Sequence, residues 1–248
     1  MRINDALEGG AMNFSIPTDA AKLSWLEKVA IRGHLDISTD GRSTQGFGIW
    51  HTGTASLLLS EAKSAANRRY SGQLLPLLAA LSAMDQFGNC YEPIAPSIPP
   101  GMENKSGIIK ALHNFLGIPI GSPDSDAIYA LRNSLLHQSG LISAGKGRVP
   151  KHYWFAIDTE SQGLFTHATV PWDGLYNSRS ATNKTVANTR AIFNLAYKLN
   201  TKLQAAFDAG NLKLSLDGGL EELLRSYVSI EFNESLDASY KQSQSRQQ

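Results

Sequence analysis

The segment that decides how this sequence is interpreted is DAIYALRNSLLH, residues 126 to 137. Ser122, Pro123 and Asp124 precede it, and a hydroxyl cap, a proline in the first turn and an early acid are typical of a helix start. Gly140 supplies a helix stop on the other side. Apolar residues recur at helical spacing between these ends, namely Ile128, Leu131 and Leu135. The segment therefore predicts an amphipathic helix.

Three polar side chains lie along one flank of this predicted helix. Arg132 falls at the edge of the apolar arc, where a guanidinium is costly unless it is paired or opens into a cleft. Asn133 and His137 are four residues apart and share a face that adjoins the arginine side. Arg132 and His137 are about 140° apart around the axis, so we expect that they cannot easily grip one phosphate from a single helix. This geometry favours a second copy of the helix.

Composition limits the classes of protein that fit this sequence. The chain has 248 residues, 42% of them hydrophobic, and a net charge of +1, so a sizeable core is expected and no global field attracts nucleic acid. The single cysteine, Cys90, excludes an internal disulfide and a cysteine-based metal cluster. No apolar run approaches the roughly 20 residues of a membrane span, and from the composition of the first residues we expect no signal peptide. We expect a soluble, cytoplasmic protein with no membrane partner, no metal and no cofactor.

Helical periodicity recurs along the rest of the chain. We expect helices over residues 19–33, 56–69, 73–87, 107–116, 122–138, 183–209 and 218–230. Residues 34–55 are rich in glycine, serine and threonine and predict a loop. Aromatic and β-branched residues at 152–157 and 163–170, around a short polar connector, predict a β-hairpin. The fold class is therefore mainly α, a helical bundle with one β-hairpin.

The residues LRNSLLH, from Leu131 to His137, resemble the signature of the HEPN superfamily. That signature is an arginine, then a polar residue, then a histidine after four to six intervening residues. Here four residues intervene and the polar residue is Asn133. The resemblance implies a HEPN-like helical domain over residues 56–210 with the hairpin at 152–170. Around it we expect a helix-and-loop extension over 1–55, a C-terminal helix packed on the domain over 211–235, and a disordered tail over 236–248.

The resemblance also implies a function. Many such domains are metal-independent endoribonucleases in toxin–antitoxin, phage-defence or stress responses, and their signature helices usually meet across a homodimer. It implies that His137 is the acid/base group for attack by the 2′-hydroxyl, that Arg132 stabilises charge on the phosphate, and that Asn133 orients His137 or holds a phosphate oxygen. The implied partners are RNA, a second copy through the Arg132–His137 helix, and an antitoxin or other partner protein. Other members lack activity, so the alternative is a non-catalytic dimerisation module that binds RNA, a nucleotide or a protein.

The chemistry of the residue types agrees with this implication. Imidazole titrates near neutrality and arginine matches phosphate oxygens in a bidentate manner. A basic loop with adjoining aromatics suits single-stranded RNA, and the residues expected to contact RNA are Lys146, Arg148, Lys151 and Tyr153, with Trp154 beside them.

Structural alternatives stay open for the same residues. Arg132 is also suited to an ion pair with Asp85 or Asp126, and His137 to a helix end, where the dipole favours it. Residues 146–151 also fit a solvated loop.

Overall fold

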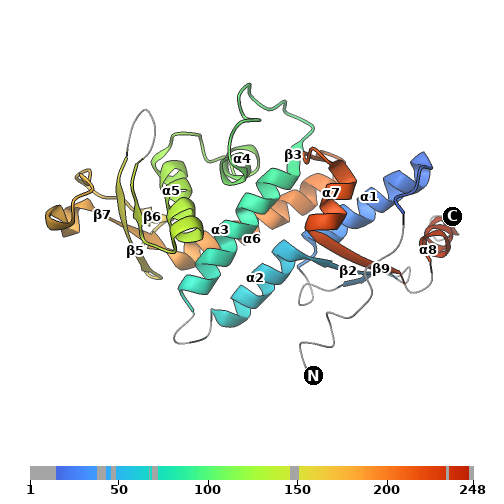
Figure 1. Ribbon diagram of the computed structural model, residues 1–248, viewed down its shortest axis with the longest axis horizontal. Helices are drawn as coiled ribbons and strands as arrows, with labels where there is room; N and C mark the ends of the chain where they lie inside the picture. Colours follow the sequence, from blue (N-terminus) through green and yellow to red (C-terminus); the bar gives the residue numbers. More distant parts are fainter. Residues whose placement is uncertain are drawn as a thin grey trace.

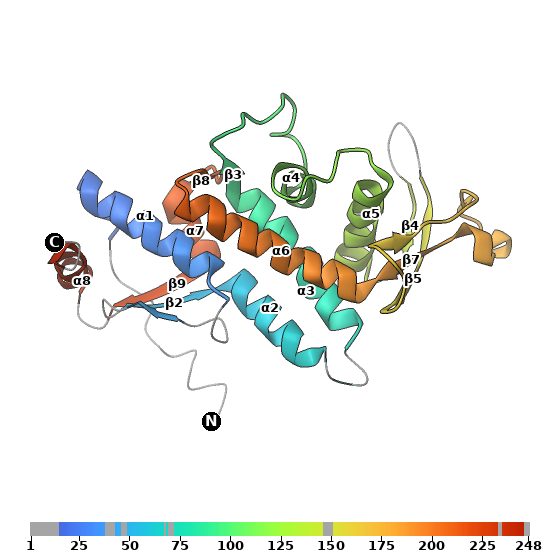
Figure 2. The same ribbon diagram turned by 180° about the vertical axis from the view of Figure 1, so that it is seen from behind.

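Helices form the centre of the molecule, with a sheet toward each end (Figure 1; Figure 2). The computed structural model describes residues 15–37, 43–45, 49–66, 68, 72–145, 151–232 and 235–245. The chain is mainly α, as predicted. Within the described residues, no helix is both long enough and apolar enough to cross a membrane. The helices are α1 (Ala20–Leu35), α2 (Thr54–Ala65), α3 (Leu74–Cys90), α4 (Gly107–Asn114), α5 (Pro123–Gln138), α6 (Thr189–Asp208), α7 (Gly219–Ser226) and α8 (Leu236–Ser245).

One hydrophobic core connects these helices. Helices α3 and α6 lie along the middle of the molecule (Figure 2), and both contribute buried apolar residues to this core. The predicted apolar stripe of α5 belongs to the same core, since Ile128 and Leu131 are fully buried and Leu135 nearly so. Burial of this kind stabilises a domain by roughly 25 cal/mol per Å² of apolar surface. It also fixes α5 rigidly, with its polar flank outside the core.

The predicted β-hairpin is wrong in its pairing. Strand β5 (Tyr153–Asp158) pairs in parallel with β7 (Lys184–Asn188), and β6 (Phe165–Thr166) pairs with the other edge of β7. With β4 (Ile142–Ser143) they form a four-stranded sheet in the order β4-β5-β7-β6, beside α5 (Figure 1). Residues 184–188 were assigned to the following helix, but their β-branched Thr185 and Val186 suit a strand. Helix α6 begins only after Asn188, whose side chain accepts the Ala191 N–H at 3.0 Å.

Three other boundaries differ from the sequence predictions. The expected loop over 34–55 contains β1 (Ser43–Gln45) and β2 (Ile49–Gly53), and the helix expected over 218–230 ends early and continues as β9 (Val228–Phe232), which pairs with β2. The two remaining short strands, β3 (Tyr91–Pro93) and β8 (Leu212–Leu214), pair with each other. Residues 236–245 of the tail predicted to be disordered form α8, held by the Lys22–Asp237 ion pair at 2.6 Å and an edge-on contact between Trp25 and Tyr240. These contacts are distant in sequence, and local composition does not reveal them.

The helix predicted over residues 73–87 continues past Gly88 and ends at Cys90. A Cβ atom at Gly88 would lie 1.8 Å from the carbonyl oxygen of Gly107 in α4, so the glycine is needed for close helix packing. We expect Gly88→Ala to lower the free energy of unfolding by about 3 kcal/mol or more, since overpacking forces the backbones apart. Urea unfolding measures this change. Gly140→Ala, where the nearest atom lies at 3.7 Å, is the matched control and should change stability little; equal effects would contradict this packing.

A buried histidine makes stability depend on pH. The His34 ring is fully buried; its Nδ1 lies 2.7 Å from the Tyr91 hydroxyl and its Nε2 lies 2.8 Å from the Gln86 amide nitrogen. Burial lowers the pKa of His34 to about 3. Because the unfolded chain takes up this proton near its ordinary pKa of about 6.5, the stabilisation is complete above that pH and falls as the pH drops toward 3.

We expect this histidine to remove about 2 kcal/mol of stability between pH 7.5 and pH 5. Urea unfolding at the two pH values measures the loss. In His34→Gln the free energies of unfolding at the two pH values should differ by about 2 kcal/mol less than in the unsubstituted chain. This holds whatever the absolute stability of the variant. An unchanged difference would show that His34 does not titrate in this way.

Candidate functional site

Helix α5 carries the polar residues singled out in the sequence. Its Ser122 cap accepts the Ser125 N–H at 3.3 Å, and Pro123 is in the first turn, as predicted. At the other end Ser139 takes a left-handed conformation, with φ 51°. The Gly140 N–H then donates to the Ser134 carbonyl at 3.0 Å, which closes the helix. Both ends of α5 are therefore fixed by local hydrogen bonds, and the position of each side chain along it is well defined.

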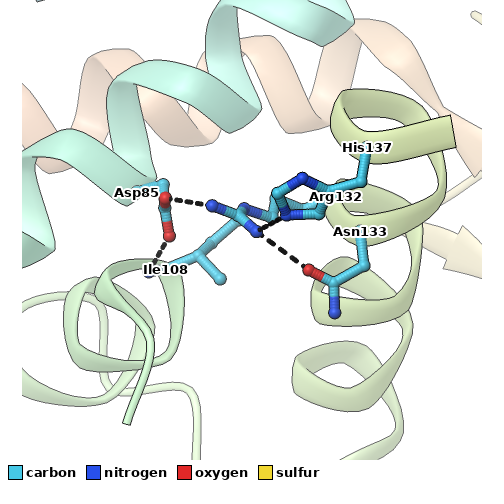
Figure 3. Close-up of polar contacts among 5 residues, drawn as sticks. All are labelled: Asp85, Ile108, Arg132, Asn133 and His137. Carbon is cyan, nitrogen blue, oxygen red and sulfur yellow. Dashed lines mark hydrogen bonds and ion pairs between the residues drawn. The ribbon is translucent and has the colours of Figure 1, made fainter. Parts of the chain in front are cut away.

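The Arg132 guanidinium is the centre of a polar network (Figure 3). Its Nη1 donates to Asn133 Oδ1 at 2.9 Å and to His137 Nε2 at 2.6 Å. Its Nη2 donates to Asp85 Oδ2 on α3 at 2.6 Å. The other carboxylate oxygen of Asp85 accepts the Ile108 N–H at 2.9 Å, in the first turn of α4. The network therefore joins three helices and brings all three predicted catalytic residues together.

The contact between Arg132 and His137 defines the state of the imidazole. Arginine can only donate hydrogen bonds, so His137 Nε2 accepts one and carries no proton in this arrangement. The ring is then neutral, with its proton on Nδ1. Of the five N–H bonds of the Arg132 guanidinium, three are used, and Nε is buried without a partner. The site thus holds an unprotonated nitrogen beside a cation.

One copy of α5 is enough to bring the cation and the imidazole together, contrary to the expectation from their angular separation. Arg132 and His137 are about 140° apart around the helix axis, yet their side chains meet at 2.6 Å. The long arginine side chain bends across Asn133 and spans the angle. A cation and an imidazole are therefore adjacent within one chain, and the homodimer stays a prediction without this geometric support.

The polar flank of α5 opens into a cleft of about 890 Å³. The opposite wall comes from β4, the residues that follow it and the start of β5. Arg132, Asn133 and His137 line the cleft together with Lys151 and Tyr153, two of the residues predicted to contact RNA. The remaining lining residues are Asp126, Tyr129, Ala130, Ser134, Gln138, Ser143, Ala144 and Gly145.

The basic and aromatic side chains of the cleft are fixed by their neighbours. Lys151 forms an ion pair with Asp126 of α5, and this hydrogen-bonded carboxylate raises the pKa of Lys151, which keeps the ammonium charged. Burial raises the pKa of Tyr153 and keeps its hydroxyl protonated. Its ring stacks at 5.2 Å on Phe155, a core residue. The cleft therefore presents a cation and a supported ring opposite the Arg132 network.

Two predicted RNA contacts, Lys146 and Arg148, lie outside the described residues. A further residue, Tyr129, was missed by the sequence analysis: it lines the cleft and is 42% exposed. It precedes Asn133 by one helical turn, and this i, i+4 spacing is the signal that indicates it.

The structure also contains the features expected if Arg132 and His137 have purely structural roles. The ion pair of Arg132 is with Asp85, one of the two partners considered, while Asp126 pairs with Lys151. His137 lies in the last turn of α5, where the helix dipole favours a cation. Arg132 thus has a structural partner on one side of its guanidinium and the cleft residues on the other.

In the part of the chain that the structure describes, no three histidine, cysteine or acidic side chains gather as ligands for a metal ion. No protein-family model matches the sequence, and neither a curated protein nor a solved structure is significantly similar to the chain.

Proposed function

We propose that this chain is a HEPN-like endoribonuclease that cleaves single-stranded RNA through attack of the 2′-hydroxyl, without a metal ion. The observation that carries the proposal is the contact between Arg132 Nη1 and His137 Nε2 in the wall of the cleft. It places a fixed cation beside an unprotonated imidazole nitrogen in a space open to solvent. These are the two groups that cleavage by the neighbouring hydroxyl requires.

The proposed reaction begins when a phosphate enters the cleft. Its oxygens compete with Asn133 and His137 for the Arg132 Nη1–H bonds, which are well matched to phosphate. His137 Nε2 is then free to accept the proton of the 2′-hydroxyl. The 2′-oxygen bonds to phosphorus, the bond from phosphorus to the 5′-oxygen breaks, and the protonated imidazole returns its proton to the leaving oxygen. The products are a 2′,3′-cyclic phosphate and a 5′-hydroxyl.

Neighbouring residues act on these two groups. Asp85 holds the Arg132 guanidinium from the α3 side at 2.6 Å and is itself fixed by the Ile108 N–H. We assign it as a positioning residue. Asn133 exchanges its bond with Arg132 for one with a phosphate oxygen or with His137. We assign Lys151 and Tyr153 to a neighbouring phosphate and base of the same strand, because both line the cleft.

The wider setting of the proposal comes from the resemblance alone. By that resemblance the protein acts in the cytoplasm as a homodimer through α5, in a toxin–antitoxin, phage-defence or stress response, with an antitoxin as a candidate partner. Part of α5 is free to form such contacts, since Tyr129, His137 and Gln138 are exposed.

A second candidate is a non-catalytic HEPN-like dimerisation module that binds RNA, a nucleotide or a protein. The ion pair between Arg132 and Asp85 favours it, because that pair gives the arginine a structural role. The two candidates differ in one experiment, in which purified protein is incubated with single-stranded RNA in EDTA. Cleavage that depends on His137 supports the nuclease, whereas binding without cleavage supports the module.

A further inference from the structure

A second cationic and aromatic feature lies directly behind the cleft, and the proposed function does not use it. We define it as the Arg179 cluster, made of Arg179, Trp154, Trp172 and Tyr176. The Arg179 guanidinium lies 5.3 Å, 5.5 Å and 4.7 Å from the ring centroids of Trp154, Trp172 and Tyr176. Cations are attracted to aromatic faces at these distances. Three rings around one cation hold it in place without a counter-charge.

The guanidinium of Arg179 keeps its capacity for hydrogen bonds. Its Nε is buried and out of a ligand's reach, but the side chain as a whole is only partly buried. Among the described residues no carboxylate lies within ion-pair distance of the guanidinium. The acid in the same loop, Asp173, accepts hydrogen bonds through Oδ1 from the Leu175 N–H at 2.8 Å and from the Ser178 hydroxyl. Lys184 neighbours Trp154 on β7. The cluster therefore has positive charge to offer to an anion.

The rings of the cluster offer surface to a base. Tyr176 is 75% exposed and the adjoining Leu175 is 65% exposed. Trp154 is half-buried. Its neighbour on β4, Ile142, is exposed, as Tyr176 and Leu175 are. An open aromatic ring beside an arginine suits a stacked nucleobase, which any sequence can supply.

The strand β5 connects this cluster to the cleft. Successive residues of a strand point to opposite faces, so Tyr153 lines the cleft while Trp154 contacts Arg179 on the other face. His152, between Lys151 and Tyr153, forms a bridge with Trp172, and its Nδ1 accepts the Gly145 N–H at 3.3 Å. The cleft residues Lys151 and Tyr153 and the Arg179 contact Trp154 therefore lie within four consecutive residues of the chain.

We infer that the Arg179 cluster is a second binding site for single-stranded RNA, which holds nucleotides flanking the one in the cleft. Arg179 binds a phosphate and Tyr176 stacks on a base. The inference rests on the proposed function and extends it, because it makes the preferred substrate a strand longer than the cleft alone can hold. A duplex, whose bases are already stacked, should bind weakly.

The test measures binding and cleavage separately. Binding of a labelled 12-nucleotide RNA in EDTA is followed by fluorescence anisotropy in the His137→Ala background, so that the strand stays intact. We expect Arg179→Ala to weaken binding about tenfold and to reduce the slope of log Kd against log salt by about 0.7, the value for one lost phosphate contact on a single strand. Tyr176→Ala should weaken binding about tenfold and leave the slope unchanged. Because Tyr176 is so exposed, its removal does not endanger the fold.

The matched control is Arg225→Ala, which removes an exposed arginine of α7 and should leave affinity unchanged at constant salt. Cleavage of a dinucleotide, which occupies only the cleft, should be unaffected by Arg179→Ala when His137 is intact. If both cluster variants bind the 12-nucleotide strand as the control does, the second site is refuted while the nuclease proposal stands; the loop then serves another partner, such as a protein. If the unsubstituted chain neither binds nor cuts RNA, both proposals fail.

Discussion

Replacing His137 with alanine is expected to slow RNA cleavage by about 100- to 10,000-fold, the range typical of lost general acid–base catalysis. The reason is local. His137 Nε2 is the unprotonated nitrogen that lies against Arg132 in the cleft, and no other histidine lines that cleft among the described residues. Initial rates on single-stranded RNA in EDTA measure the effect. Since the side chain is exposed, stability should change by less than about 0.5 kcal/mol.

A matched control for this variant is His167→Ala. The His167 imidazole also bonds to α5, with Nε2 2.8 Å from a carboxylate oxygen of Asp124, but it does not line the cleft. Removal of the His167 side chain should leave the cleavage rate within about twofold of that of the unsubstituted chain. This change is much smaller than the one expected from the loss of an acid–base group. Undiminished cleavage by His137→Ala, or an equal loss in both variants, would remove the imidazole from the mechanism.

Replacing Arg132 with alanine is expected to affect both activity and stability. Activity should fall by about 100- to 1,000-fold, as when one donor to a developing anion is removed. The free energy of unfolding should fall by about 3 kcal/mol, because the Asp85 carboxylate is left largely buried without its cation. The side chains of the pair are only 18% and 14% exposed. Urea unfolding measures the loss of stability. Cleavage rates, measured under conditions where the variant is folded, measure the loss of activity separately.

Two further variants show whether Arg132 acts on the substrate or only supports the fold. Arg132→Lys keeps the charge but cannot reach Asp85, Asn133 and His137 at once, so it should recover little activity. Arg32→Ala breaks an exposed pair with Asp208, at 53% and 63% side-chain exposure, and should cost less than about 1 kcal/mol. If the folded Arg132→Ala variant cleaves RNA at the normal rate, the role of Arg132 is structural. The proposed nuclease mechanism then lacks the cation that it requires.

The sequence predicted α5 and its polar flank well because the signals are local. A capping serine, a proline in the first turn and an apolar stripe all lie within the segment itself. The choice of Asp85 as partner was less certain from sequence, since it precedes Arg132 by 47 residues. Only the packing of α3 against α5 decides between Asp85 and Asp126. The contact with His137 depends on how the arginine side chain bends, which residue spacing does not reveal.

The sheet beside the cleft was beyond local prediction. Strand β5 was located from its aromatic residues, but its neighbour β7 lies next to a long helix in sequence and was absorbed into it. Parallel pairing of β5 with β7 depends on a connection of many residues, which propensity does not specify. The same pairing positions Trp154 and leaves it open to Arg179. The Arg179 cluster therefore could not be derived from the sequence pattern.

The central claim is that Arg132 and His137 direct the 2′-hydroxyl of RNA against its own phosphate. It is tested most directly by comparing a single-stranded RNA with the same strand carrying a 2′-deoxy residue at the cleavage site, both in EDTA, and identifying the new ends. We predict that only the RNA is cut and that it carries a 2′,3′-cyclic phosphate and a 5′-hydroxyl. Cleavage of the 2′-deoxy strand, or cleavage that leaves a 5′-phosphate, would contradict the account.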